Sequence, residues 1–131
     1  MSIQLQGVFQ ITAWDEQPYT ENDDGSKLTN AKITQTYSGD IEGTSELQYL
    51  MAYSPSGAAH FVGIETVTCT IEGKLGSIVL QHIGKFEAGV ASSKFTILAN
   101  SGNNALSDLS GSGSFTSGEN GQASYLINLE K

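Results

Sequence analysis

Two residues near the middle of the chain, Glu65 and His82, have side chains that together could carry out acid–base chemistry. A histidine titrates near neutral pH, and a neighbouring carboxylate makes it a plausible proton donor or acceptor in catalysis. The same two groups can also form a structural pair that satisfies its own hydrogen bonds in an apolar core. The sequence favours the structural pair, because structural ion pairs also perturb titration, and it leaves Glu65 and His82 as the catalytic candidates.

The element that would bring the two residues together is a hairpin within residues 60–87, HFVGIETVTCTIEGKLGSIVLQHIGKFE. A Gly-X pair suits a two-residue loop, so we predict the turn at Gly73 and Lys74. With this loop Glu65 lies directly opposite His82, and a loop of four residues gives the same pairing. The face that carries this pair is otherwise apolar and should therefore point into the core. Its apolar members are Phe61, Val67, Cys69, Ile78, Leu80 and Phe86.

The rest of the chain has the alternation and turn residues of further strands and contains no convincing amphipathic helix. We predict an all-β fold: one antiparallel β-barrel of about eight strands, with residues 1–131 as a single domain. Such a barrel is either filled by side chains or holds one small ligand. Besides the central hairpin, strands are expected at 3–14, 30–38, 43–54, 90–99, 110–118 and 123–130, with one helical turn at 105–109 that points Leu106 and Leu109 inward.

Residues 15–26, DEQPYTENDDGS, are predicted to be a solvated acidic loop. Aligned as an EF-hand calcium loop on Gly25, the segment places Thr20 and Ala31 at the first and last ligand positions, which excludes that motif. The aromatic residues Trp14 and Tyr19 leave a lid role open. We expect no metal: two histidines and one cysteine are too few for a typical zinc site, and a mixed site of Glu65, His82 and Cys69 would have apolar neighbours.

Composition excludes several classes of partner. The 131 residues carry a net charge of −8, with six lysines and no arginine, which argues against nucleic acid and against an anionic membrane surface. The single cysteine cannot form an intramolecular disulfide, and the first ten residues lack the features of a signal peptide. No stretch approaches the length of a transmembrane helix. We therefore expect a reducing, cytoplasmic location.

Four segments carry a resemblance to a known family: ITAWDEQPY, YSGDIEGTSELQYLMAY, FVGIETVTCTIEGKLGSIVLQHIGKF and LSGSGSF with GQASYLINLE. In this order they resemble the small bacterial family catalogued as domain of unknown function 3224. The resemblance implies an allene-oxide-cyclase-like β-barrel, distantly shared with dirigent-type proteins, and no established activity. Allene oxide cyclases hold an oxidised fatty acid in the barrel, but their binding residues do not match positions here, so no site is transferred.

The sequence is consistent with three functions. The first is a barrel that binds a small apolar or amphipathic molecule and uses no cofactor. The second is an isomerase or cyclase in which Glu65 or His82 moves a proton. The third is a filled barrel that self-associates through outer residues such as Val62, Ile64, Val79 and Ile83, giving a homo-oligomer. The expected ligand-binding residues are Trp14, Tyr49, Phe61, Glu65, Val67, Leu80, His82 and Phe86. A cavity of about 300 Å³ or more beside Glu65 and His82 would favour the first two functions, and a solid interior the third.

Overall fold

The computed structural model describes residues 2–98, 102–104, 106–107, 109–118 and 121–130. These residues form strands and turns, and none of them lies in a helix long and apolar enough to cross a bilayer. The nine strands are β1 (Ser2–Glu21), β2 (Lys27–Gly39), β3 (Ile41–Tyr53), β4 (Ala59–Ile71), β5 (Lys74–Glu87), β6 (Val90–Ile97), β7 (Asn103–Asn104), β8 (Ser110–Ser117) and β9 (Gln122–Glu130).

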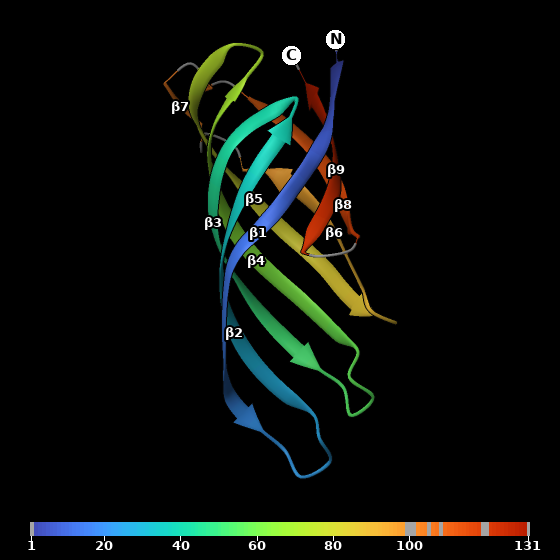
Figure 1. Cartoon of the computed structure of the whole chain (residues 1–131). Coiled ribbons are helices and arrows are strands. Elements are labelled where there is room, and N and C mark those ends of the chain that lie inside the picture. The colour runs from blue at the N-terminus through green and yellow to red at the C-terminus, as the bar shows by residue number, and fades with distance from the viewer. Residues whose placement is uncertain (1, 99–101, 105, 108, 119–120, 131) are drawn as a thin grey trace.

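Eight of these strands close into an antiparallel barrel (Figure 1). The sheet order is β4-β3-β2-β1-β9-β8-β6-β5, and a further pairing of β4 with β5 closes the ring. The two-residue strand β7 lies outside the ring and pairs with Gly76 and Ser77 of β5. Closure joins the first and last strands of the sheet, and it confirms the predicted fold class.

Inner and outer residues alternate along the strands as the sequence predicts. In β3 the residues Ser45, Leu47, Tyr49 and Met51 are buried, whereas the residues between them are exposed. This alternation follows from the period of two in a strand, which places neighbouring side chains on opposite faces. At the predicted helical turn, Leu106 is buried and Leu109 packs against the core, while residues 105 and 108 lie outside the described part of the chain.

The register of the central hairpin differs from the prediction. The loop is Glu72–Gly73, not Gly73–Lys74, and both residues have positive φ, 53° and 78°. These values belong to a type I′ turn, whose twist matches that of the strands it joins. Glu65 is therefore paired with Leu80, and His82 is paired with Gly63. Because the partner strand moves by two residues, every side chain keeps its predicted face.

The predicted acidic loop at 15–26 is also wrong for most of its length. Strand β1 continues to Glu21, and the chain reverses over residues 22–26, where the Asn22 amide bonds the Ser26 carbonyl. Beyond Gln10 strand β1 pairs with β2 alone, so this part of β1 is an edge strand and tolerates Pro18. Residues 12–21 of this edge strand are exposed to water except Glu16, which is half-buried, and this exposure explains why a polar sequence forms strand here.

A β-bulge at Thr12 changes which residues of β1 face inward. The pairing with β2 shifts between Ile11 and Ala13, so the inward parity passes from odd to even positions. Trp14 and Glu16 consequently lie on the inner side of the sheet, whereas strict alternation would have turned them outward. Figure 1 shows that the β1–β2, β3–β4 and β5–β6 hairpins lie at the end of the barrel opposite the two termini.

Candidate functional site

Glu65 and His82 meet inside the barrel, although they are not a direct cross-strand pair. They lie diagonally across the β4–β5 ladder on the same inner face, a separation that long side chains can span. His82 Nε2 is 2.7 Å from Glu65 Oε1. The predicted neighbourhood of the two residues is therefore confirmed, by a different register from the predicted one.

Two further strands complete a buried hydrogen-bonded network around this pair. The Tyr37 hydroxyl of β2 donates to Glu65 Oε2 at 2.7 Å, and Ser93 Oγ of β6 lies 2.9 Å from His82 Nδ1. Glu65 and His82 are each 1% exposed, so the network is closed to bulk water. We call these four residues the polar core. Tyr37 and Ser93 lie outside the central hairpin, and its sequence does not predict that they contact Glu65 and His82.

The hydrogen bonds leave no side-chain polar atom of Glu65 or His82 without a partner. Ser93 Oγ lies 2.9 Å from His82 Nδ1 and 3.2 Å from the Lys94 carbonyl, so its hydroxyl can donate to either atom. Tyr37 supplies its own proton to Glu65. Every polar atom of the Glu65–His82 pair therefore has a partner. An arrangement this complete stabilises the core without needing a ligand.

Burial raises the pKa of three other ionisable groups in the lumen. It raises the pKa of Tyr37 well above its ordinary value, and the charge and hydrogen bond of Glu65 raise it further. Burial and then the charge of Glu65 also raise the pKa of Tyr49. The Cys69 thiol has its pKa raised to about 11 for the same two reasons, first burial and then Glu65. These groups stay protonated at neutral pH, and Cys69 has the inert character that the sequence predicted.

A layer of aromatic rings separates the polar core from the end of the barrel that carries the long hairpins. Tyr49 packs on Phe61 with 4.5 Å between ring centroids, and on His82 at 5.7 Å. Phe115 lies 5.8 Å from His82 and makes an edge contact with Phe9. The rings fill the lumen at this level.

Beyond this aromatic layer lies a hollow of about 100 Å³, which we call the mouth hollow. Four expected site residues line it: Trp14, Tyr49, Phe61 and Phe86. The other four, Glu65, Val67, Leu80 and His82, lie deeper, are each 1% exposed and do not line it. The remaining lining residues are Phe9, Ile11, Gln35, Met51, Ala91, Phe115, Ser117, Gly118, Gly121, Gln122 and Ala123.

Two glycines make room for the rings of this layer. A Cβ atom at Gly63 would collide with the Tyr49 ring and the Gln48 carbonyl oxygen. A Cβ atom at Gly84 would collide with the Phe61 ring and the Ser92 carbonyl oxygen. The aromatic layer therefore depends on strand positions that have no side chain.

Trp14 is held at the mouth by a carboxylate. Its indole N–H donates to Glu16 Oε1 at 3.1 Å, and Thr29 and Tyr53 donate to Glu16 Oε2 at 2.6 and 2.7 Å. Burial alone would raise the pKa of Glu16, but these hydrogen bonds and Lys27 outweigh burial and lower it. Trp14 remains 45% exposed and forms part of the rim. This cluster depends on the bulge at Thr12, which the sequence analysis did not identify.

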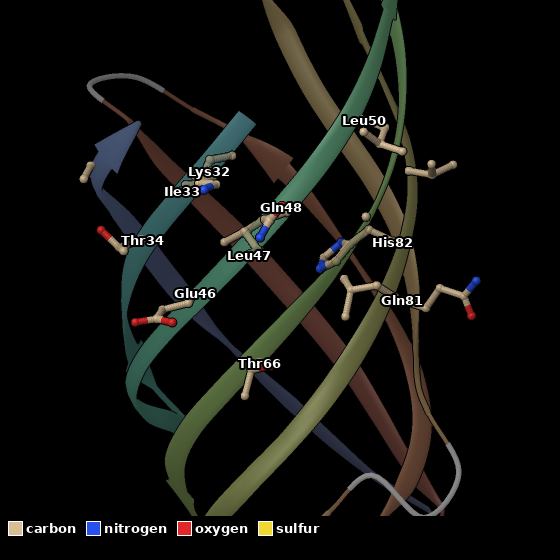
Figure 2. Close-up of a pocket in the computed structure, with 14 residues that line it drawn as sticks. Lys32, Ile33, Thr34, Glu46, Leu47, Gln48, Leu50, Thr66, Gln81 and His82 are labelled. Carbon is tan, nitrogen blue, oxygen red and sulfur yellow. The ribbon is translucent and has the colours of Figure 1, made fainter. Parts of the chain in front are cut away.

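A larger hollow, about 880 Å³, lies outside the barrel across β2 to β5. Figure 2 shows Glu46, Gln48 and Leu50 of β3 along it, and shows Gln81 and His82 pointing to opposite sides of β5. Most residues that line it are exposed, including Leu50, Val62 and Ile64, so this hollow belongs to the outer surface. The described residues contain no cluster of three or more histidine, cysteine or carboxylate side chains that could hold a metal ion.

Comparison with known proteins gives a family and no activity. A family model described as "Protein of unknown function (DUF3224)" matches residues 5–129. A crystal structure of a protein of unknown function from the DUF3224 family of Shewanella oneidensis MR-1 is similar to this chain, with a TM-score of 0.81 and 28% identity. The match covers 99% of this chain and 97% of that one. No curated protein matches.

Proposed function

The chain belongs to the DUF3224 family, and from its structure we propose that it binds the apolar end of a small molecule in the mouth hollow. The observation that carries this proposal is the convergence of aromatic side chains on a hollow at the open end of the barrel. Ligand pockets are mostly apolar, with a few polar groups, and they occur at the mouths of barrels. A cytoplasmic location is part of this proposal, because the single cysteine is free and buried.

The size of the hollow limits what it can take. A cavity of about 150 Å³ lined by aliphatic and aromatic side chains holds benzene. The mouth hollow has about 100 Å³, is not lined by Glu65 or His82 and is open past Trp14, so it is not the cavity of about 300 Å³ beside these two residues that the sequence analysis set as the criterion for a ligand site. It therefore suits one end of a ligand, such as a ring or a short alkyl segment, while the rest of the molecule extends to the rim. In this proposal the polar core supports the barrel wall and does not touch the ligand.

The chain offers a direct probe, since Trp14 is its single tryptophan and lies at the rim. We expect alkylbenzenes and short 1-alkanols to change the Trp14 fluorescence in a saturable way. Ala91→Leu adds bulk to a residue that lines the hollow and should abolish the effect, whereas Val90→Leu, at an exposed neighbour, should not. A response that never saturates, or that survives Ala91→Leu, would count against the proposal.

The same assay addresses the catalytic alternative. If Glu65 moved a proton on a bound ligand, Glu65→Gln would abolish any chemical change in that ligand and leave binding largely intact. If the polar core is structural, Glu65→Gln should alter neither binding nor the ligand. Nuclear magnetic resonance of the recovered ligand distinguishes the two cases.

We propose self-association as a second function, because apolar residues form a continuous surface on the outer face. Leu50 pairs directly with Val62, and Val62 pairs directly with Ile83. Ile64 follows on the same face, and Val79 is half-buried beside this group. Leu50, Val62, Ile64 and Ile83, which we call the outer patch, are all about half or more exposed. On a molecule with net charge −8, this neutral surface is where a second copy would meet the least repulsion.

Light scattering at increasing protein concentration tests this second proposal. We expect a dimer or larger oligomer that Val62→Lys converts to monomer, because a lysine in the centre of a buried patch leaves an unpaired charge. Val8→Lys, at an exposed apolar residue on β1, is the matched control. A monomeric wild-type chain at high concentration would exclude the outer patch as an interface between copies.

A further inference from the structure

Two polar atoms of residues that line the mouth hollow, the Gln35 amide nitrogen and the Tyr49 hydroxyl oxygen, have no hydrogen-bond partner among the residues that the structure describes. Gln35 of β2 and Tyr49 of β3 are each 4% exposed, and both line the hollow. The Gln35 carboxamide has one long contact, with Ser45 Oγ at 3.5 Å from its oxygen. Within the described part of the chain, neither the Gln35 amide nitrogen nor the Tyr49 hydroxyl makes a hydrogen bond.

These two atoms are not enclosed by protein either. Among described residues, the one fully enclosed side-chain nitrogen or oxygen without a partner is Asn30 Oδ1. The Gln35 nitrogen and the Tyr49 hydroxyl must therefore reach a space large enough for a water molecule. Both residues line the mouth hollow, so we take that hollow as the space. A buried donor without a partner is costly, and sites that bind polar ligands contain such donors.

We infer that Gln35 and Tyr49 donate hydrogen bonds to an uncharged oxygen acceptor of the ligand, such as a ketone or aldehyde carbonyl. This inference rests on the proposed function and assigns the chemical class of the bound end. The Gln35 nitrogen can only donate, and burial keeps Tyr49 protonated and able to donate. An apolar ring or chain would occupy the aromatic wall while its carbonyl points toward β2 and β3.

The acceptor should be neutral and not a carboxylate. Tyr49 lies close enough to Glu65 for the charge of that carboxylate to raise its pKa. A second negative charge in this apolar lumen would be repelled by Glu65 and would lose its hydration. The chain also carries a net charge of −8, which disfavours the approach of anions.

Three probes of similar shape test this inference: ethylbenzene, acetophenone and benzoate. Binding is followed by two-dimensional nuclear magnetic resonance of the ¹⁵N-labelled chain, including the side-chain amide of Gln35, which is assigned from its absence in Gln35→Met. Acetophenone is the more polar of the two neutral probes, so burial alone predicts that it binds more weakly than ethylbenzene. We expect the opposite order, with acetophenone about tenfold tighter, as hydrogen bonds to two unpaired donors would give.

Variants separate this inference from the proposed function. Gln35→Met and Tyr49→Phe should each lower the affinity for acetophenone relative to that for ethylbenzene, measured on the same variant. Either variant suffices if the other fails to fold. Binding of ethylbenzene as tight as that of acetophenone would overturn the inference and leave the proposed function standing. Binding of benzoate as tight as that of acetophenone would overturn the neutral acceptor. Binding of none of the three would overturn the proposed function itself.

Discussion

Replacing Glu65 by leucine should destabilise the protein strongly, whereas replacing it by glutamine should not. Glu65 accepts the Tyr37 hydroxyl at 2.7 Å and contacts His82 Nε2 at 2.7 Å. Glutamine can keep both bonds: its carbonyl accepts from Tyr37, and its amide donates to Nε2 of the neutral His82 tautomer in which Nδ1–H donates to Ser93. Leucine can keep neither bond, although it fills a similar space.

The magnitude follows from the number of groups left without a partner. Glu65→Leu leaves the Tyr37 hydroxyl and His82 Nε2 unsatisfied in a region that is 1% exposed. Each such group costs about 1–3 kcal/mol, so the loss in the free energy of unfolding should be about 2–6 kcal/mol. That is a large part of the about 5–15 kcal/mol typical of a folded domain. Glu65→Gln should cost less than about 1.5 kcal/mol, the net value of one ordinary hydrogen bond.

Urea unfolding followed by circular dichroism measures these differences. The slope against denaturant should stay constant, so that the midpoint alone reports the change in stability. Glu46→Gln, on the exposed face of β3, is the matched control and should stay within about 0.5 kcal/mol of the wild type. The double variant Glu65→Leu/Tyr37→Phe should be less destabilised than the two single losses together, because it removes one unsatisfied group.

Two results would refute this reasoning. If Glu65→Leu were as stable as the wild type, the polar core would contribute nothing to the fold. If Glu65→Gln were as damaging as Glu65→Leu, the negative charge itself, and not the hydrogen bonds, would be what the core requires.

Three further predictions follow from the structure. In urea unfolding, Gly84→Ala should destabilise the chain by about 1–3 kcal/mol, because its Cβ atom would collide with the Phe61 ring. The control Gly118→Ala should be tolerated, because the nearest atom to its Cβ would be 3.8 Å away. Equal effects of the two variants would contradict the close packing at Gly84. Cys69, buried and with a pKa of about 11, should not react with a thiol reagent at pH 8 until urea unfolds the chain, so rapid native reaction would disprove its burial. The pKa of Glu16 is lowered on folding, so its stabilising contribution is present above the ordinary value of 4.5 and is lost as the pH falls through the lower folded value. The Trp14 fluorescence should change in that range and lose this change in Glu16→Gln; an identical acid titration in the variant would rule out the contact.

Local sequence patterns are sufficient to predict the barrel class and which side chains of the central hairpin and of β3 face inward. Alternation of apolar and polar residues is a local property, and the pleat of a strand converts it directly into two faces. For that reason Tyr49, Phe61, Glu65 and His82 were assigned to the interior before their partners were known. These residues face inward although the predicted turn was wrong. The observed register differs from the predicted one by two residues, and a shift of two leaves each side chain on the same face of the sheet.

Some site residues could have been found by the same rule. Gln35 lies between Ile33 and Tyr37 on the inner face of β2, and the alternation of residues 30–38 already placed a polar amide among apolar neighbours. A polar residue at an inward position of a strand is a signal for a network or a ligand contact. By contrast, the partnership of Tyr37 and Ser93 with Glu65 and His82 joins four strands, and no local pattern encodes it.

The register of the central hairpin, the β-bulge and the filling of the lumen depend on contacts between strands and are not predictable from local patterns. The register depended on whether Glu72 would adopt a positive φ, which strand twist favours and residue type does not. The bulge at Thr12 places Trp14 on the inner side of the sheet. Pairing with β2 extends strand β1 through the acidic, polar residues 15–21. How much space remains inside the barrel depends on how rings from different strands pack over glycines. That packing is a property of contacts between residues distant in sequence, so it emerges only when the sheet closes.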